Sequence, residues 1–381
     1  MSENKIENAM KIGIITQPLR TNYGGLLQAY ALQTVLERMG HQVSILDVPY
    51  KKRLFLWKMP LVLAKRLILK YLLGRKLVVF AEFIYNKQIF TVSQYTRLFI
   101  SKYLHRIEIS NFNKLDNANF DALVVGSDQV WRPRYNDDIY KCFLDFAQSW
   151  RVKRLSYAAS FGTDQWEFTL KQTMECARLA SLFDVITVRE DSGVKLCSDY
   201  LGVSASHVLD PTLLLDREDY DRLVSAISIQ KSVGNMMSYV LDSSPEVTAL
   251  VQKVAKQKHL ILFNAISRVE DLSAPMGERI QLPVEQWLRG FQDASFVITD
   301  SFHACVFSII YNIPFVVLGN FKRGQSRFHS LLKQFGLEDR LVSSVEEVMG
   351  VKEINWQSVN KRKRELKDVS KNILCQMLSS I

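Results

Sequence analysis

His303 is the residue in this sequence whose surroundings best suit chemistry. It ends the pentapeptide Thr-Asp-Ser-Phe-His, which begins with the last residue of the β-type run Phe296–Thr299 and leads into an apolar run that stops at Pro314. The pattern predicts a buried strand, a tight turn capped by Asp300 or Ser301, and a helix with His303 in its first turn. Ligands of open α/β sheets bind beyond such strand ends, where free N–H groups favour an anion. An imidazole placed there could transfer protons near neutral pH, although a structural role fits the lone residue equally well.

Four other apolar runs end in polar residues or glycine. They lead into Asn22-Tyr23-Gly24-Gly25, into Ser127-Asp128-Gln129, into Ser160 and into Arg189. Because these groups follow predicted strands, we expect them to lie on the rim where a ligand would bind. Gly24 and Gly25 let a ligand approach the backbone closely, or else form a tight packed turn. Trp131 offers an apolar face on which a sugar ring could stack.

A basic glycine loop, Asn320–Arg327, follows the strand Phe315–Leu318. Arg323 and Arg327 could clamp a phosphate or carboxylate with paired N–H donors, or could be solvated loop cations. The five cysteines are far apart and include no Cys-x-x-Cys pair, so neither a zinc site nor a disulfide framework is expected. No other metal cluster is apparent, and no cofactor is expected.

The order of the predicted elements indicates two α/β domains. An apolar fraction of 48% and a charged fraction of 23% are those of a globular protein. We predict an N-terminal Rossmann-like domain over residues 1–215, a C-terminal one over 216–350 and a terminal helix over 351–381 that packs back on the first domain. The polar start has no apolar stretch of a secretory signal, so a cytoplasmic location is expected.

The net charge of +10 belongs to one segment. Between Lys51 and Arg106 the chain carries 13 Lys and Arg against Glu82 alone, so the remainder is close to neutral. This argues against a nucleic-acid protein with a generally basic surface. The segment, about residues 51–106, has helical spacing of apolar and basic residues. It could touch an anionic membrane on its inner face, pack on the domain with Lys and Arg stems, or bind a partner or polyanionic glycan.

Six motifs, in order, resemble the polysaccharide pyruvyl transferase family. They are Thr-Asn-Tyr-Gly-Gly-Leu-Leu-Gln-Ala-Tyr-Ala-Leu (21–32), Val-Gly-Ser-Asp-Gln-Val-Trp (125–131), Tyr-Ala-Ala-Ser-Phe-Gly (157–162), Val-Arg-Glu-Asp-Ser (188–192), Asp-Pro-Thr (210–212) and Thr-Asp-Ser-Phe-His (299–303). The resemblance extends from about Lys11 to Val342. It implies two Rossmann-like domains facing across a cleft, as in GT-B glycosyltransferases, with a C-terminal helix that crosses back.

The resemblance also implies phosphoenolpyruvate as co-substrate, a glycan or lipid-linked sugar as acceptor, and a pyruvate ketal as product. His303 matches the family histidine implicated in donor binding and catalysis. Asp128 or Asp300 would orient a hydroxyl or act as base. The loop 22–25, Ser127, Ser160 and Ser301 would contact the donor, and Gln129 and Trp131 the acceptor.

The sequence departs from the family at Ser301, where many members carry arginine two places before the histidine. Arg189, Arg323 or Arg327 then supplies the anion contact, or donor use has changed. Two alternatives stay open: a GT-B-like glycosyltransferase that uses a nucleotide sugar, and a non-catalytic protein that binds glycan in its cleft. The sequence leaves the oligomeric state open.

Overall fold

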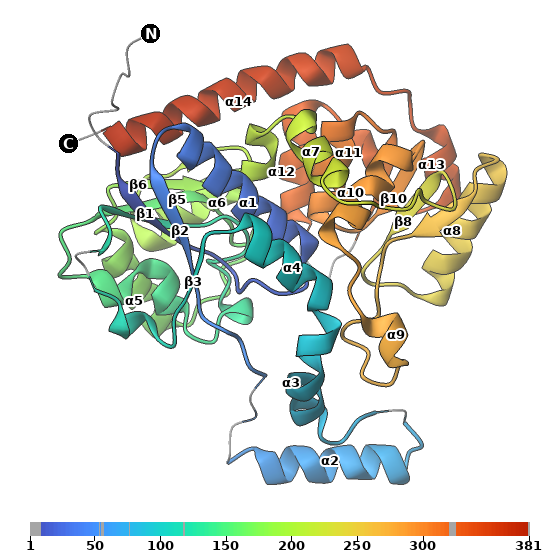
Figure 1. Ribbon diagram of the computed structural model, residues 1–381, viewed down its shortest axis with the longest axis horizontal. Helices are drawn as coiled ribbons and strands as arrows, with labels where there is room; N and C mark the ends of the chain where they lie inside the picture. Colours follow the sequence, from blue (N-terminus) through green and yellow to red (C-terminus); the bar gives the residue numbers. More distant parts are fainter. Residues whose placement is uncertain are drawn as a thin grey trace.

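The protein, described here from a computed structural model, is built around two parallel β-sheets (Figure 1). The structure describes residues 9–52, 54, 57–75, 77–116, 119–319 and 325–379. One sheet is formed by the chain up to residue 207 and the other begins at residue 236. The two Rossmann-like domains of a GT-B-like fold are therefore present, as the sequence predicts.

The first sheet has seven strands in the order β3-β2-β1-β4-β5-β6-β7. They are β1 (Lys11–Ile15), β2 (Gln42–Asp47), β3 (Arg106–Glu108), β4 (Ala122–Val125), β5 (Lys153–Ala159), β6 (Val185–Val188) and β7 (Ser206–His207). Strand β4 is central, and all four of its residues are buried. Its uninterrupted apolar sequence is what a parallel strand covered on both faces requires.

The second sheet has five parallel strands in the order β12-β11-β10-β8-β9. They are β8 (Met236–Tyr239), β9 (Leu262–Asn264), β10 (Phe296–Thr299), β11 (Phe315–Leu318) and β12 (Leu341–Val342). Between β10 and β11 runs helix α11 (Phe302–Tyr311), every residue of which is buried. This apolar helix fixes where His303 lies, because its first turn starts at the carboxyl end of β10.

The remaining helices pack around the two sheets, except for α2 and α3, which project away from them (Figure 1). In the first domain they are α1 (Tyr23–Arg38), α2 (Met59–Tyr71), α3 (Ala81–Val92), α4 (Gln94–Tyr103), α5 (Leu170–Ala180) and α6 (Asp191–Leu196). After residue 215 they are α7 (Arg217–Ser225), α8 (Pro245–Gln257), α9 (Met276–Arg279), α10 (Val284–Asp293), α12 (Ser326–Phe335), α13 (Val345–Gly350) and α14 (Trp356–Ser379).

Helix α14 crosses from the second domain back over the first (Figure 1). Its apolar positions Leu374 and Met377 are buried in a core cluster that contains residues of both domains. Two polar contacts attach it to the first domain: Lys153 Nζ donates to the carbonyl of Leu378 at 2.9 Å, and Ser370 Oγ accepts from the N–H of Leu209 at 3.0 Å. The predicted crossing helix is thus observed.

Helices α2 and α3 project from the body of the molecule at the end remote from α14 (Figure 1). Both lie within the basic segment, which also contains α4. Arg66 of α2 forms two hydrogen bonds with Glu82 of α3, at 2.8 and 2.7 Å, and so ties the two helices together. Among the helices of the described ranges, none is both long enough and apolar enough to cross a lipid bilayer.

The apolar sequence His207–Leu215 predicts a strand interrupted by its proline, but most of that strand is absent. Only residues 206–207 form β7, and Pro211–Leu214 is a short 3₁₀ helix. Pro211 cannot donate to a sheet ladder, and the Asp210 carboxylate instead accepts from the N–H of Thr212. This side chain–backbone bond turns the chain away from the sheet and brings Asp210 into the interior.

Candidate active site

The carboxyl ends of the strands of both domains border a cleft. Two adjoining cavities of about 680 and 700 Å³ lie there, and both are lined by Thr21, Asn22, Asp242 and Glu270. The first also includes Gly24 and Ser301, and the second includes Asp128 and Gln129. The cleft is therefore where the strand-end rule places a ligand.

Asp210 is the centre of a buried polar cluster behind this cleft. Its Oδ2 atom lies 3.0 Å from Arg189 Nη1, 3.3 Å from Ser127 Oγ and 3.7 Å from His303 Nε2. Its Oδ1 accepts from the hydroxyl of Thr212 at 2.6 Å. Burial by itself would raise the pKa of Asp210, but the contacts with His303, Arg189 and Thr212 outweigh it and hold the pKa well below its ordinary value. The carboxylate is thus kept charged beside the imidazole.

His303 joins the two domains at this cluster. His303 is only 6% exposed, so it lies behind the cleft wall and not in the open cleft. Nε2 faces Asp210 without forming a hydrogen bond of ordinary length, and Nδ1 lies against Gly24. Gly24 itself lines the cleft. Nδ1 is therefore the ring nitrogen nearest to a ligand.

Position 24 suits only glycine, because His303 occupies the space that a side chain would need. A β-carbon at Gly24 would lie 2.0 Å from His303 Nδ1, whereas one at Gly25 would meet only the exposed side chain of Asn22, at 3.3 Å. We predict that Gly24→Ala destabilises the fold by about 1–3 kcal/mol through overpacking. Gly25→Ala is the matched control, which we expect to be neutral or slightly stabilising because alanine is the better helix former. Urea denaturation of both variants tests this, and equal stability would contradict the contact.

Arg189 lies among three carboxylates and interacts with each of them. Besides Asp210, its Nη2 lies 3.4 Å from Asp128 Oδ1, and its Nε lies 3.5 Å from Glu190 Oε1. Burial would lower the pKa of Arg189, but Glu190, Asp210 and Asp128 together raise it. The prediction of Arg189 as a direct anion clamp therefore needs correction: it positions Asp128 and Asp210.

Arg327 is the second buried cation of the cluster, contributed by α12. The guanidinium carbons of Arg189 and Arg327 lie 4.4 and 5.8 Å from the centre of the Phe302 ring. Burial, followed by repulsion from Arg189, lowers the pKa of Arg327 to about 10. Because Arg189 repels this positive charge, an anion bound next to the two guanidinium groups would be favoured. Arg323 lies outside the described residues.

Ser160 is completely buried and does not line the cleft. Its hydroxyl donates to Glu190 Oε1 and accepts from the N–H of Gly162. The second carboxylate oxygen of Glu190 is buried without a hydrogen-bond partner. Ser160 is therefore corrected from donor contact to a residue that positions Glu190.

Two aromatic residues predicted to face the ligand are instead structural. Trp131 is fully buried, stacks on Phe143 at 4.9 Å between ring centroids, and donates its indole N–H to the carbonyl of Cys142. Tyr23 stacks on Trp287 of the second domain at 5.4 Å and donates its hydroxyl to the carbonyl of Leu282. Neither ring has a face left for a substrate, so both predictions are wrong.

Asp300 is also structural. Its carboxylate oxygens accept from the N–H groups of Leu241 and Asp242 at 2.6 and 2.9 Å, which fixes the loop after β8 to the end of β10. A carboxylate held by two backbone donors is a poor base, so the catalytic prediction for Asp300 is withdrawn. Ser301, at the N-cap of α11, is half-buried at the cleft wall.

The sequence reasoning missed three groups. Gln28, in the buried face of α1, accepts from the N–H of Ser127 and donates to Thr16, and so fixes the Ser127 turn. Tyr50 and Tyr135 are 38% and 45% exposed and line the cleft, which gives it the aromatic faces that Trp131 lacks. The only hint for Tyr135 was its position shortly after the Gly-Ser-Asp turn.

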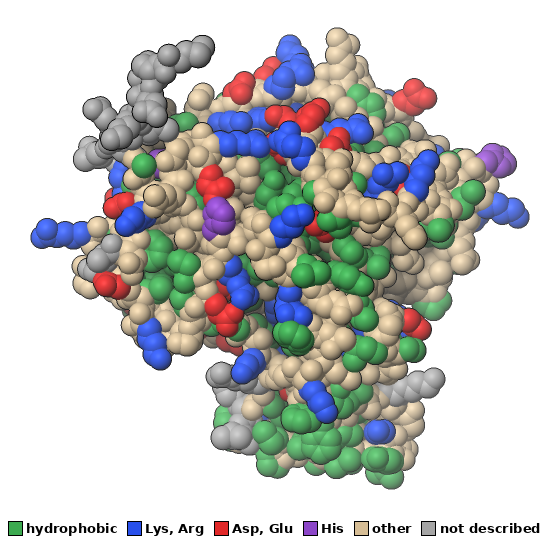
Figure 2. Space-filling model, viewed as in Figure 1, with side chains coloured by type: hydrophobic (Ala, Val, Ile, Leu, Met, Phe, Trp, Pro, Cys, Tyr) green, Lys and Arg blue, Asp and Glu red, His purple; other side chains and the backbone are tan. Residues whose placement is uncertain are grey.

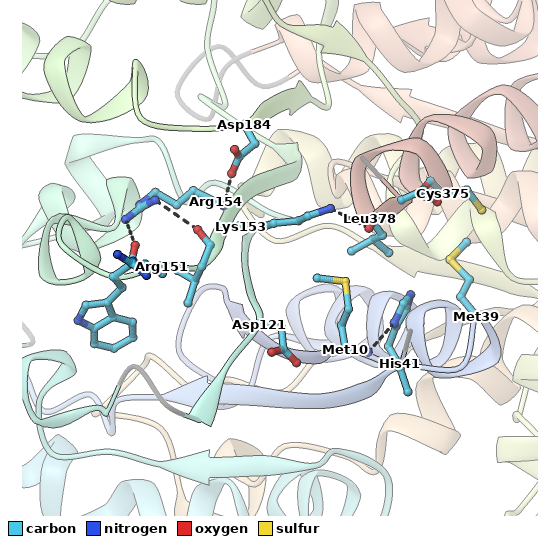
Figure 3. Close-up of a pocket in the computed structure, with 14 residues that line it drawn as sticks. Met10, Met39, His41, Asp121, Arg151, Lys153, Arg154, Asp184, Cys375 and Leu378 are labelled. Atoms are coloured by element: carbon cyan, nitrogen blue, oxygen red, sulfur yellow. Dashed lines mark hydrogen bonds between the residues drawn. The ribbon is translucent and has the colours of Figure 1, made fainter. Parts of the chain in front are cut away.

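A still larger cavity, of about 880 Å³, lies at the opposite edge of the first sheet (Figure 3). It borders the amino ends of the strands, and its polar groups already bind backbone. Asp184 accepts from the N–H of Arg154, His41 accepts from that of Met10, and Lys153 donates to a carbonyl of α14 (Figure 3). Its polar groups serve the packing of α14, and we do not assign it as the site. In the described ranges no group of three or more His, Cys, Asp or Glu side chains is arranged to hold a metal.

The comparisons agree with this two-domain reading. Arabidopsis thaliana UGT89C1 complexed with UDP-L-rhamnose superimposes with a TM-score of 0.52 over 98% of this chain and 100% of that chain, at 6% identity. A glycosyltransferase from Rickettsia africae ESF-5 gives 0.49 over 97% and 96%, at 10% identity. Such likeness concerns the fold alone. No curated protein matches the sequence significantly.

The family is settled by sequence. The polysaccharide pyruvyl transferase family matches residues 22–322, which is most of the chain. The protein therefore belongs to the polysaccharide pyruvyl transferase family. Asp128, Arg189, Asp210 and His303 all fall inside the matched range, whereas Arg327 lies just beyond it.

Proposed function

We propose that the protein transfers the pyruvyl group of phosphoenolpyruvate to a sugar of a bacterial surface glycan in the cytoplasm. Two sugar hydroxyls add to C2 of the donor, the bond from C2 to the phosphate oxygen breaks, and C3 is protonated to a methyl group. One hydroxyl proton thus ends on C3 and the other leaves with phosphate. The reaction needs an acid for carbon, a base for hydroxyls and a cation for the donor.

One observation carries the proposal: His303 of the second domain meets Asp210 of the first directly behind the cleft. We assign His303 as the general acid that protonates C3, with Asp210 as the residue that positions the ring. Asp128 lines the cleft and is the candidate base for a sugar hydroxyl.

The donor is assigned to the Arg327 side of the cluster. Because Arg189 is engaged by carboxylates, Arg327 takes the place of the arginine that this sequence lacks two positions before His303. A phosphate or carboxylate beside Arg327 would offset the repulsion between the two buried guanidinium groups.

The acceptor is assigned to the outer cleft. Tyr50 and Tyr135 offer faces for sugar rings. Asp137, Asp242 and Glu270 line the same cavity, opposed by Arg20 and Arg134. Because Lys52 also pairs with Glu270, the charges around this cavity nearly balance, which favours a neutral acceptor sugar over a strongly charged one.

The test is to incubate the purified protein with phosphoenolpyruvate and candidate glycans. We expect phosphate release together with an acceptor mass gain equal to pyruvic acid less one water. Turnover of nucleotide sugars without use of phosphoenolpyruvate would reject the proposal in favour of a glycosyltransferase.

Donor binding should depend on Arg327 before any acceptor is known. We predict that phosphoenolpyruvate raises the melting temperature, because saturation at a hundred times Kd stabilises a protein by about 2.7 kcal/mol. Arg327→Met should lose most of this shift. Lys333→Met, an exposed position on the same helix, is the control and should keep it. A full shift in Arg327→Met would place the donor elsewhere.

A further inference from the structure

Helix α2 carries an apolar face that nothing in the described part of the chain covers. None of its residues is buried. Trp57 just before the helix, Leu61 and Ile68 within it, and Leu72 just after it are 73%, 73%, 52% and 77% exposed. Their spacing of four, seven and four positions places them on one face of the helix. A protein in water exposes such a row at a cost unless something else covers it.

Helix α3 extends this apolar surface. Phe80, Phe83 and Phe90 are 60%, 69% and 66% exposed. Figure 2 shows hydrophobic side chains gathered at the tip of the projection, over α2, with basic side chains beside them. The exposed surface is therefore a patch on the projecting segment rather than scattered single residues.

The charges around this patch are almost all positive. Lys58 and Lys65 lie on the flank of the α2 face, given the helical spacing, and α2 contains no Asp or Glu. The one acidic residue of the segment, Glu82, is paired with Arg66. A face that is apolar at its centre and basic at its edge matches the boundary between acyl chains and anionic headgroups.

We propose that Trp57–Leu72 docks in the plane of an anionic lipid bilayer, with its apolar face among the acyl chains and its lysines at the headgroups. A second copy of the chain fits this face less well. Two copies meeting through it would bring their excess cations together, with only the already paired Glu82 to offset them. The lipid surface supplies both the apolar interior and the negative charge.

The docking segment is connected to the cleft through α3, to which the Arg66–Glu82 ion pair ties it. Lys52 Nζ lies 2.5 Å from Glu270 Oε2 and 3.8 Å from the centre of the Tyr85 ring on α3. The Tyr85 hydroxyl accepts from Arg20 at 3.0 Å, and both Arg20 and Glu270 line the cleft. A docked α2 would thus hold the cleft at a fixed place near the membrane. If the proposed function holds, this geometry suits an acceptor sugar anchored in that membrane.

Flotation of the full chain with phospholipid vesicles tests the docking. We expect binding at low salt to phosphatidylcholine vesicles containing phosphatidylglycerol, little binding to phosphatidylcholine alone, and release as salt rises. Ile68→Glu/Leu72→Glu should lower the partition by at least about tenfold, since it removes apolar insertion and adds negative charge. Leu170→Glu/Met174→Glu on α5 is the matched control, because these residues are 78% and 67% exposed at the same spacing; it should bind like the wild type.

Two outcomes would overturn the inference. One is equal flotation of the α2 variant and the α5 control, or no flotation of the wild type. The other is a wild type that is dimeric in light scattering and a variant that is monomeric. That result would assign the face to a second copy of the chain. Turnover of a soluble acceptor should not change in the α2 variant, so loss of docking and failure of the proposed reaction are separable.

Discussion

His303→Ala is expected to fold normally and to lose about 10²–10⁴-fold in kcat/KM, the range that a general acid contributes. In the proposed reaction the imidazole supplies the proton that turns the donor methylene into a methyl group, and neither the Asp210 carboxylate nor the Arg189 guanidinium could replace it. Substitution also leaves a small hole behind Gly24 and removes one partner of Asp210, but Arg189 and Thr212 still hold that carboxylate, so the fold should be retained. Turnover and thermal unfolding should therefore respond very differently.

The matched control is His329→Ala, an exposed histidine on α12. It should keep full turnover. Phosphate release from phosphoenolpyruvate in the presence of acceptor is the measurement for both variants. Near-wild-type turnover in His303→Ala would remove the imidazole from the mechanism, and equal losses in both variants would indicate a general effect of substitution on that side of the cleft.

The sequence predicts the sheets well because their central strands are short apolar runs with no alternative use. Residues 122–125, 296–299 and 315–318 carry no charge and are buried throughout. An apolar composition is misleading over His207–Leu215, because residues of the same kind there form a short 3₁₀ helix instead of a strand. There the outcome depends on a side chain, Asp210, that bonds to its own backbone.

The site could be predicted only in part. The rule that ligands lie beyond strand ends applies to each strand separately and takes no account of contacts between distant segments. It brings Ser127, Asp128, Arg189 and His303 to one region. It does not say which of them faces the ligand, because that depends on residues far away in sequence. Trp287 covers Tyr23, and Phe143 covers Trp131. No single-sequence pattern reports such contacts between distant segments.

Arg189 departs from its expected role for a physical reason. Arg189 was expected at the ligand but is surrounded by Asp128, Glu190 and Asp210. Three carboxylates cannot share a buried space without a cation, so the guanidinium is needed for the fold itself. We therefore propose that the donor contacts the buried arginine on the other domain, Arg327. Binding of the donor and closure of the two domains are expected to be coupled through this pair.

Arg189→Met is expected to lower the free energy of unfolding by about 3–5 kcal/mol at neutral pH, the cost of leaving buried charges without their partner. Methionine fills much of the volume and still packs on Phe302, so the loss is electrostatic. Urea denaturation followed by far-ultraviolet circular dichroism is the measurement. Arg178→Met, an exposed arginine on α5 paired with Glu175, is the control and should change stability by less than about 1 kcal/mol.

The loss of stability in Arg189→Met should also depend on pH, and the direction of that dependence identifies its cause. In the wild type the pKa of Asp210 is depressed by folding, so its contribution to stability is present above the unfolded pKa and is lost only in strong acid. Without Arg189 the pKa of Asp210 should move up toward its ordinary value, because one of the contacts that depress it is lost while His303 and Thr212 remain. The folded variant then takes up this proton at a higher pH than the folded wild type, so the stability gap between them should be smaller at about pH 3 than at about pH 7. A gap that stays constant across this window would mean that Arg189 contributes packing alone and that the three carboxylates do not depend on it.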